Sequence, residues 1–153
     1  MYAMQVSRRV RAAPAAVYRA LLDPQAVARW RAPAGMSAHV HAFDAREGGR
    51  FGVSLTYDGQ RGKGKSGAHT DTYHGHFARL VPDELVVEVI EFETEDEALR
   101  GTMTMTTSLT AVDGGTEVAV LHEGVPDVVS REDNETGTRM ALDNLARLVE
   151  GGG

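Results

Sequence analysis

The segment from Pro14 to Trp30, PAAVYRALLDPQAVARW, constrains the fold of this chain more than any other. Its apolar residues repeat at helical spacing at Val17, Ala20 and Leu21. Pro24 stops this helix, because the residue before a proline is pushed out of the α region. Asp23 therefore ends the first helix and caps a second, which runs from about Pro24 to Trp30. We predict two short helices that follow a first strand over Gln5 to Arg11.

The sequence that follows the helix pair alternates between apolar and polar residues as β-strands do. After a turn at 46–50, Phe51, Val53, Leu55 and Tyr57 share one face. Further strands are predicted over Tyr73 to Val81, Leu85 to Phe92 and Met103 to Leu109, with a solvated charged turn over Glu93 to Arg100. Asp113-Gly114-Gly115 is a hairpin signal, and Val118, Val120 and His122 then share one face of the last strand.

The segment from Asp133 to Glu150 predicts one long amphipathic helix. Its expected apolar stripe consists of Met140, Ala141, Leu145 and Leu148. A helix pair, a run of strands and a closing helix together indicate an α+β fold in which a sheet is covered by the last helix.

Length and composition exclude several classes of protein. The 153 residues fit a single domain, expected over 1–153, which buries a core without disulfides. The chain has no Cys, a net charge of −6 and no long apolar run, so we expect neither membrane insertion nor nucleic-acid binding. We therefore predict a soluble, cytoplasmic protein.

Five motifs in order carry a resemblance to a known family. They are P-x-x-V-Y-x-A-L-x-D-P-x(5)-W from Pro14, E-G-G-R-F from Glu47, Gly75-His76-Phe77 followed by Val81-Pro82, G-G-T-E-V from Gly114, and the terminal helix. The chain resembles the START-like (SRPBCC) superfamily over about Val6 to Glu150, and most of all the branch named for the activator of Hsp90 ATPase. Where that branch usually carries Gly-Trp at the start of the last helix, this chain has Gly137-Thr138.

The resemblance implies a helix-grip fold, also called Bet v 1-like, in which a curved antiparallel sheet surrounds the C-terminal helix. It also implies a cavity that takes an apolar or amphipathic molecule, lipid-like or polyketide-like, without proven catalysis and without a cofactor. An enclosed cavity above about 300 Å³ is expected for such a role. The side chains that we expect to bind the ligand are Trp30, Phe51, Val53, Leu55, Tyr57, Tyr73, Phe77, Phe92, Met103, Met105, Val120, His122 and Met140.

Two other functions stay open. One is a chaperone-associated or stress-response module, which the Hsp90-activator name suggests. The other is a cyclase-type or hydrolase-type enzyme in which His122 acts with Tyr57, Tyr73 or an acidic residue of the cavity. No carboxylate pair, G-x-S-x-G elbow or Cys nucleophile supports catalysis, so we expect a binding protein more than an enzyme.

Two motifs point to ligands that we do not expect. Gly59 to Ser66 matches the P-loop pattern G-x-x-x-x-G-K-S, but no helical stripe follows to complete a phosphate site. His39-x-His41 and His74-x-His76 each place two imidazoles on one strand face, yet no Cys or H-E-x-x-H supports a zinc site, so no metal is predicted. An exposed sheet edge and the segment from Val86 to Phe92 permit a homodimer without requiring one.

Overall fold

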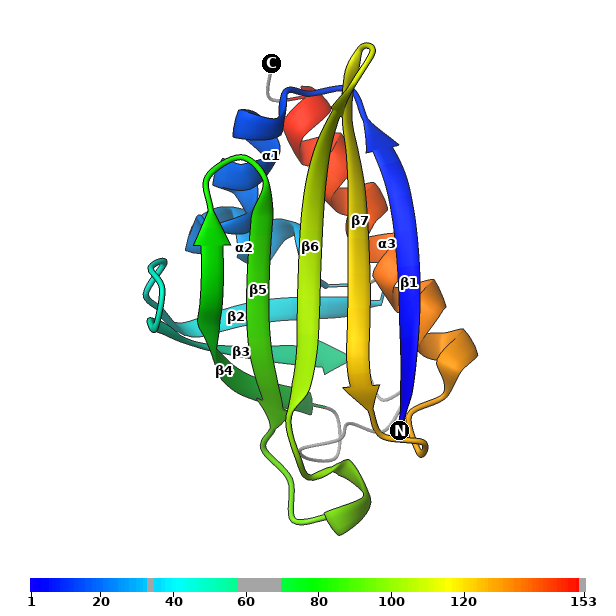
Figure 1. Cartoon of the computed structure of the whole chain (residues 1–153). Coiled ribbons are helices and arrows are strands. Elements are labelled where there is room, and N and C mark those ends of the chain that lie inside the picture. Colours follow the sequence, from blue (N-terminus) through cyan, green and yellow to red (C-terminus); the bar gives the residue numbers. More distant parts are fainter. Residues whose placement is uncertain (33–34, 58–69, 152–153) are drawn as a thin grey trace.

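Seven antiparallel strands form one curved sheet in the computed structural model, which describes residues 1–32, 35–57 and 70–151 (Figure 1). The strand order is β1-β7-β6-β5-β4-β3-β2. In chain order the elements are β1 (Tyr2–Val10), α1 (Pro14–Leu21), α2 (Pro24–Trp30), β2 (Met36–Phe43), β3 (Arg50–Tyr57), β4 (Thr70–Val81), β5 (Leu85–Phe92), the 3₁₀ turn η1 (Glu97–Leu99), β6 (Met103–Val112), β7 (Gly115–Val125) and α3 (Arg131–Gly151). The predicted α+β helix-grip architecture is confirmed.

The hinge between the two short helices forms as the Asp-Pro break predicts. The Asp23 carboxylate accepts a hydrogen bond from the backbone N–H of Gln25 at 2.9 Å, which caps α2. At the other end of α2, the Trp30 indole donates to the Ala20 carbonyl at 2.9 Å and so ties α2 to α1. All three helices lie on the same side of the sheet (Figure 1).

The inner face of the sheet, which faces the helices, carries the alternating apolar residues that the strand pattern predicts. Met105, Thr107 and Leu109 of β6 are buried, and Val118 and Val120 of β7 lie beside them. On β3 and β4, Phe51 and Phe77 pack with ring centroids 5.0 Å apart. The hairpin predicted at Asp113-Gly114 joins β6 to β7, and Gly114 adopts a φ of 81° that favours glycine.

The buried stripe of α3 differs from the predicted one. Its buried residues are Leu142, Leu145 and Ala146, whereas Met140 is 37% exposed. Two residues along a helix correspond to roughly 200° of rotation, so Met140 and Leu142 face nearly opposite directions. The expectation that Met140 belongs to the buried stripe was therefore wrong, whereas Leu145 is buried and Ala141 and Leu148 pack partly buried against the core.

Two further expectations need correction. The segment from Val86 to Phe92 lies in β5, at the centre of the sheet and paired with both β4 and β6, so it offers no free edge for a dimer. The edges are β1 and β2. The charged segment before β6 is not wholly solvated either, since Leu99 of η1 is buried and Asp96 caps that turn.

The P-loop match from Gly59 to Ser66 lies outside the described residues. The described chain resumes at Thr70 as a strand, not a helix. Among the described residues, no helix has both the length and the apolar character needed to cross a membrane. The single-domain extent and the location in the cell stay predictions.

Gly75 generates the first testable prediction. A Cβ atom at this position would lie 1.9 Å from the Val89 carbonyl oxygen and 3.0 Å from Phe51 Cζ, so neither β5 nor the Phe51 ring leaves room for it. We expect Gly75→Ala to lower the free energy of unfolding by about 2 kcal/mol or more, as overpacking does. Urea denaturation measures this change.

The matched control is Gly52→Ala on the neighbouring strand β3. There the nearest atom to an added Cβ is His41 Cβ at 3.9 Å, an ordinary contact. Alanine in a strand is favoured over glycine by roughly 0.5–1 kcal/mol, so this variant should be as stable as the parent or more so. Equal stability of the two alanine variants would contradict the prediction.

Candidate functional site

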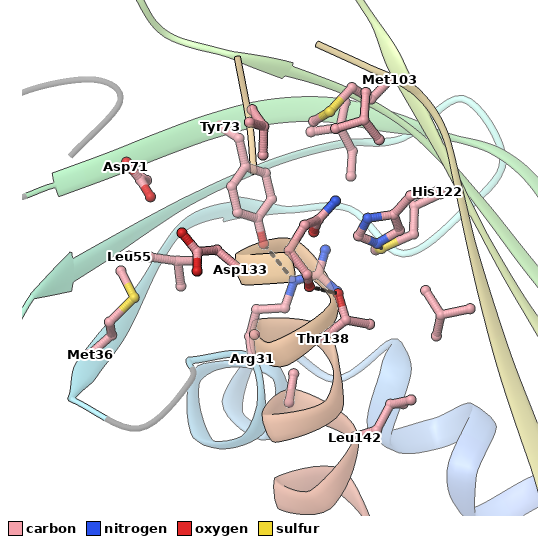
Figure 2. A pocket seen from close by; sticks show the side chains of 18 of the residues that line it. Arg31, Met36, Leu55, Asp71, Tyr73, Met103, His122, Asp133, Thr138 and Leu142 are labelled. Carbon is pink, nitrogen blue, oxygen red and sulfur yellow. Dashed lines mark hydrogen bonds between the residues drawn. The ribbon is translucent and has the colours of Figure 1, made fainter. Parts of the chain in front are cut away.

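A cavity of about 280 Å³ lies between the inner face of the sheet and the first half of α3 (Figure 2). It is partly open to the surface, so the expectation of an enclosed cavity above about 300 Å³ is not met. Ligand pockets usually begin near 300 Å³. A molecule that binds here is therefore small or leaves part of itself at the opening.

The cavity exists because the side chains that α3 presents to the sheet change along the helix, from small or polar ones to apolar ones. Asp133, Asn134, Gly137 and Thr138 of its first half border the cavity, and none of them has a large apolar side chain that could fill it. In the second half, Leu142 and its neighbours pack directly against the core. The position where the family usually has tryptophan, Thr138, thus faces the cavity.

The structure separates the predicted ligand-binding residues into three groups. The cavity is lined by Trp30, Leu55, Tyr57, Tyr73, Phe92, Met103, Met105, Val120 and His122. Phe51, Val53 and Phe77 do not border it, because they belong to the packed core beside β2 and α2. Met140 lies outside it on the exposed side of α3. Whether the first group binds a ligand stays a prediction.

Arg31 introduces a charge that the sequence reasoning missed. It follows α2 directly, and its side chain reaches the cavity wall, where Arg31 Nε donates to the Tyr73 hydroxyl at 2.7 Å (Figure 2). Arg31 Nη2 lies 3.5 Å from Glu88 Oε2, and the two side chains are only 14% and 13% exposed. The guanidinium also stacks beside Trp30 and Tyr73, 5.3 and 5.5 Å from their ring centroids.

Glu88 is a buried carboxylate behind this wall. Burial raises its pKa above the ordinary value of 4.5, and the nearby Arg31 guanidinium opposes that rise. Burial likewise raises the pKa of Tyr73, which keeps the phenol protonated at neutral pH. The alternation of Val86, Glu88, Ile90 and Phe92 along β5 is the signal that could have placed Glu88 on the inner face.

His122 lies on the opposite side of the cavity from β4, on β7. Burial lowers its pKa from 6.5 to about 4, Arg31 contributes to this lowering, and a hydrogen bond with Asn134 opposes it. Its Nε2 lies 3.0 Å from the sulfur of Met105. At neutral pH the imidazole is uncharged, and a base with a pKa near 4 is poorly matched to proton abstraction at that pH.

The histidines of the two predicted pairs lie away from the cavity, on the outer face of the sheet. His41 Nε2 is 2.6 Å from Ser54 Oγ, and His74 Nε2 is 3.1 Å from Glu91 Oε2. Within 1–32, 35–57 and 70–151, no group of three or more His, Cys, Asp or Glu is arranged to hold a metal ion.

Arg31 generates a prediction about stability. Arg31→Met leaves the Glu88 carboxylate buried without its cationic partner, which costs about 3 kcal/mol at pH 7.5. The loss should shrink at pH 5, because the raised pKa of Glu88 rises further in the variant and the carboxyl takes up a proton. Urea denaturation at both pH values measures the two losses.

The double variant Arg31→Met/Glu88→Gln is the control. It removes both charges and should recover most of the stability lost at pH 7.5. A single Arg31→Met variant as stable as the parent at pH 7.5 would show that Glu88 does not depend on Arg31.

His122 generates a prediction about pH. Its folded-state pKa of about 4 lies below the unfolded value of 6.5, so the unfolded chain binds the extra proton first. The stability from this group is fully present above pH 6.5 and lost as the pH falls toward 4, by at most about 3 kcal/mol. The stability of His122→Gln should therefore decrease less than that of the parent between pH 7 and pH 4. Thermal unfolding over this pH range measures both decreases.

His76→Gln is the matched control, since His76 is exposed on the outer face of β4. It should keep the pH dependence of the parent. If His122→Gln and the parent lose stability in parallel, His122 is not the group responsible.

Known proteins with the same fold match nearly the whole chain. A protein of known structure from Chromobacterium violaceum is 31% identical, with 97% of this chain and 96% of that chain covered and a TM-score of 0.86. An AHSA1-like protein from Aeromonas hydrophila is 20% identical, with 99% and 94% covered and a TM-score of 0.75. A protein from Arthrobacter aurescens is 15% identical, with 97% and 86% covered and a TM-score of 0.82. The last two likenesses show the fold alone.

No curated protein matches the chain significantly. Residues 11–150 match the family described as activator of Hsp90 ATPase homolog 1-like protein. The chain therefore belongs to this AHSA1-like family, a branch of the START-like superfamily.

Proposed function

We propose that the protein binds a small amphipathic molecule in the cavity between the sheet and α3. The observation that carries this proposal is the contrast within the cavity wall. Much of the wall is apolar, from Leu55, Ile90 and Met103 among others. Arg31 and Tyr73 place polar groups together at one position, and α3 adds further polar groups from Asp133, Asn134 and Thr138. Binding sites for small molecules share this combination of an apolar surface and a few convergent polar groups.

The methionines support an adaptable site. Met36, Met103 and Met105 border the cavity from β2 and β6. Methionine has three rotatable bonds and a polarizable sulfur, so it fits ligands of varied shape. An apolar chain that lies against these residues and extends through the opening would suit a cavity of this volume.

We assign no reaction to the site. His122, the base considered from the sequence, is uncharged and weakly basic in this environment. Association with Hsp90 is named in the family's description, and none of the described features of this chain argues for it. The cavity, and not chaperone association, is therefore the basis of the proposal.

Thr138→Trp tests whether the cavity is the binding site. The indole would extend into the cavity from α3, and the Thr138 hydroxyl that is lost bonds only the Asn134 carbonyl one turn earlier among the described residues. We expect the variant to bind the neutral fluorophore N-phenyl-1-naphthylamine at least about tenfold more weakly than the parent, because the apolar volume is filled. Fluorescence titration measures the dissociation constants.

Met140→Trp is the matched control, two residues further along α3 and on its exposed side. It adds the same indole outside the cavity and should bind the fluorophore as the parent does. Unchanged binding by a folded Thr138→Trp variant would place the fluorophore elsewhere and remove the support for the proposal.

A further inference from the structure

We infer that the cavity selects ligands that carry an uncharged oxygen acceptor, such as a ketone or ester carbonyl, over ligands that carry a carboxylate. The Tyr73 hydroxyl would donate to the acceptor, and Glu88 would suppress carboxylate binding by neutralising Arg31. The inference rests on the proposed function, because it names the ligand class of the same cavity.

Tyr73 provides the donor. A phenol has one hydrogen to donate, and its oxygen here accepts from Arg31 Nε at 2.7 Å. Within the described residues no acceptor receives the hydrogen of Tyr73 itself, and this side chain borders the cavity. A hydrogen bond accepted from a cation polarises the phenol and strengthens it as a donor. The hydroxyl is thus prepared to bind an oxygen acceptor on a ligand.

Arg31 would by itself favour carboxylates, and Glu88 prevents this. Glu88 Oε2 lies 3.5 Å from Arg31 Nη2 on the side away from the cavity, since Glu88 does not border the cavity and Arg31 does. The negative charge of Glu88 therefore offsets part of the attraction that Arg31 would exert on a carboxylate in the cavity. A carboxylate that entered would lose its hydration without gaining an unpaired cation.

The remainder of the cavity also disfavours an anion. Asp133 borders the cavity from the first turn of α3, on the helix that forms one wall (Figure 2). The His122 imidazole on β7 is uncharged at neutral pH and contributes no positive charge. A neutral carbonyl meets none of these costs, since an uncharged acceptor loses far less hydration energy than an ion.

Two probes of equal carbon number test the inference. 2-Nonanone and nonanoate share the apolar chain and differ in the polar end. Each would displace bound N-phenyl-1-naphthylamine at pH 8, where nonanoate is ionised. We expect the ketone to bind the parent at least about tenfold more tightly than the carboxylate.

Variants then assign the preference to residues. Tyr73→Phe should weaken ketone binding by about fivefold to tenfold, the effect of one lost hydrogen bond, with Tyr18→Phe on α1 as a control that does not border the cavity. Glu88→Gln frees the charge of Arg31 and should strengthen nonanoate binding at least about tenfold, so the ratio of ketone affinity to nonanoate affinity should fall. Glu91→Gln, on the outer face of the same strand, should leave both affinities unchanged.

The ratio of the two affinities within one variant does not depend on its overall stability, so a destabilised but folded variant remains informative. Tighter binding of nonanoate than of 2-nonanone by the parent would overturn the inference and leave the proposed function standing. An unchanged ratio in folded Glu88→Gln would overturn the role of Glu88. If neither probe nor the fluorophore binds the parent, both the inference and the proposed function fail.

Discussion

The long helix α3 packs on the apolar inner face of the sheet beside α1 and α2, and it does so with apolar side chains along only half of its length. The residues from Ala141 onward bring Leu142, Leu145 and Ala146 into the core. The earlier turns bring Asn134, Gly137 and Thr138 to the same face, where they cannot fill the space in front of β6 and β7. The packed core and the cavity are thus two consequences of the same contact, and the composition of α3 decides where one ends and the other begins.

The second constraint is the burial of charge next to this cavity. A guanidinium and a carboxylate that are each about one-seventh exposed are stable only as partners, because desolvation of either alone costs several kcal/mol. Arg31 comes from the end of α2 and Glu88 from the middle of the sheet. The pair therefore joins the end of α2 to β5, and Tyr73 extends it to β4. Asn144 of α3 adds a second link to the segment after α2 by donating to the Ala32 carbonyl at 2.8 Å.

Much of the fold could be read from local patterns. Asp23-Pro24 predicted the break between α1 and α2, and Asp113-Gly114 predicted the last hairpin, because proline and glycine act on the backbone where they stand. The predicted stripe of α3 wrongly included Met140, since residue type alone does not show whether an apolar side chain on a helix is exposed or buried. Glu88 was not among the residues predicted to line the site, although the alternation of its strand places it inside.

The sequence by itself determined the elements, their order and which strand positions share a face, since each depends on neighbours a few residues apart. It also determined the family, through motifs spread over nearly the whole chain. Only the tertiary structure decided which of the inward side chains meet a packed neighbour and which meet a cavity. It alone brought Arg31, Tyr73 and Glu88 together. Arg31 lies 42 positions from Tyr73 and further from Glu88, and no local pattern encodes the distance between groups so far apart in the sequence.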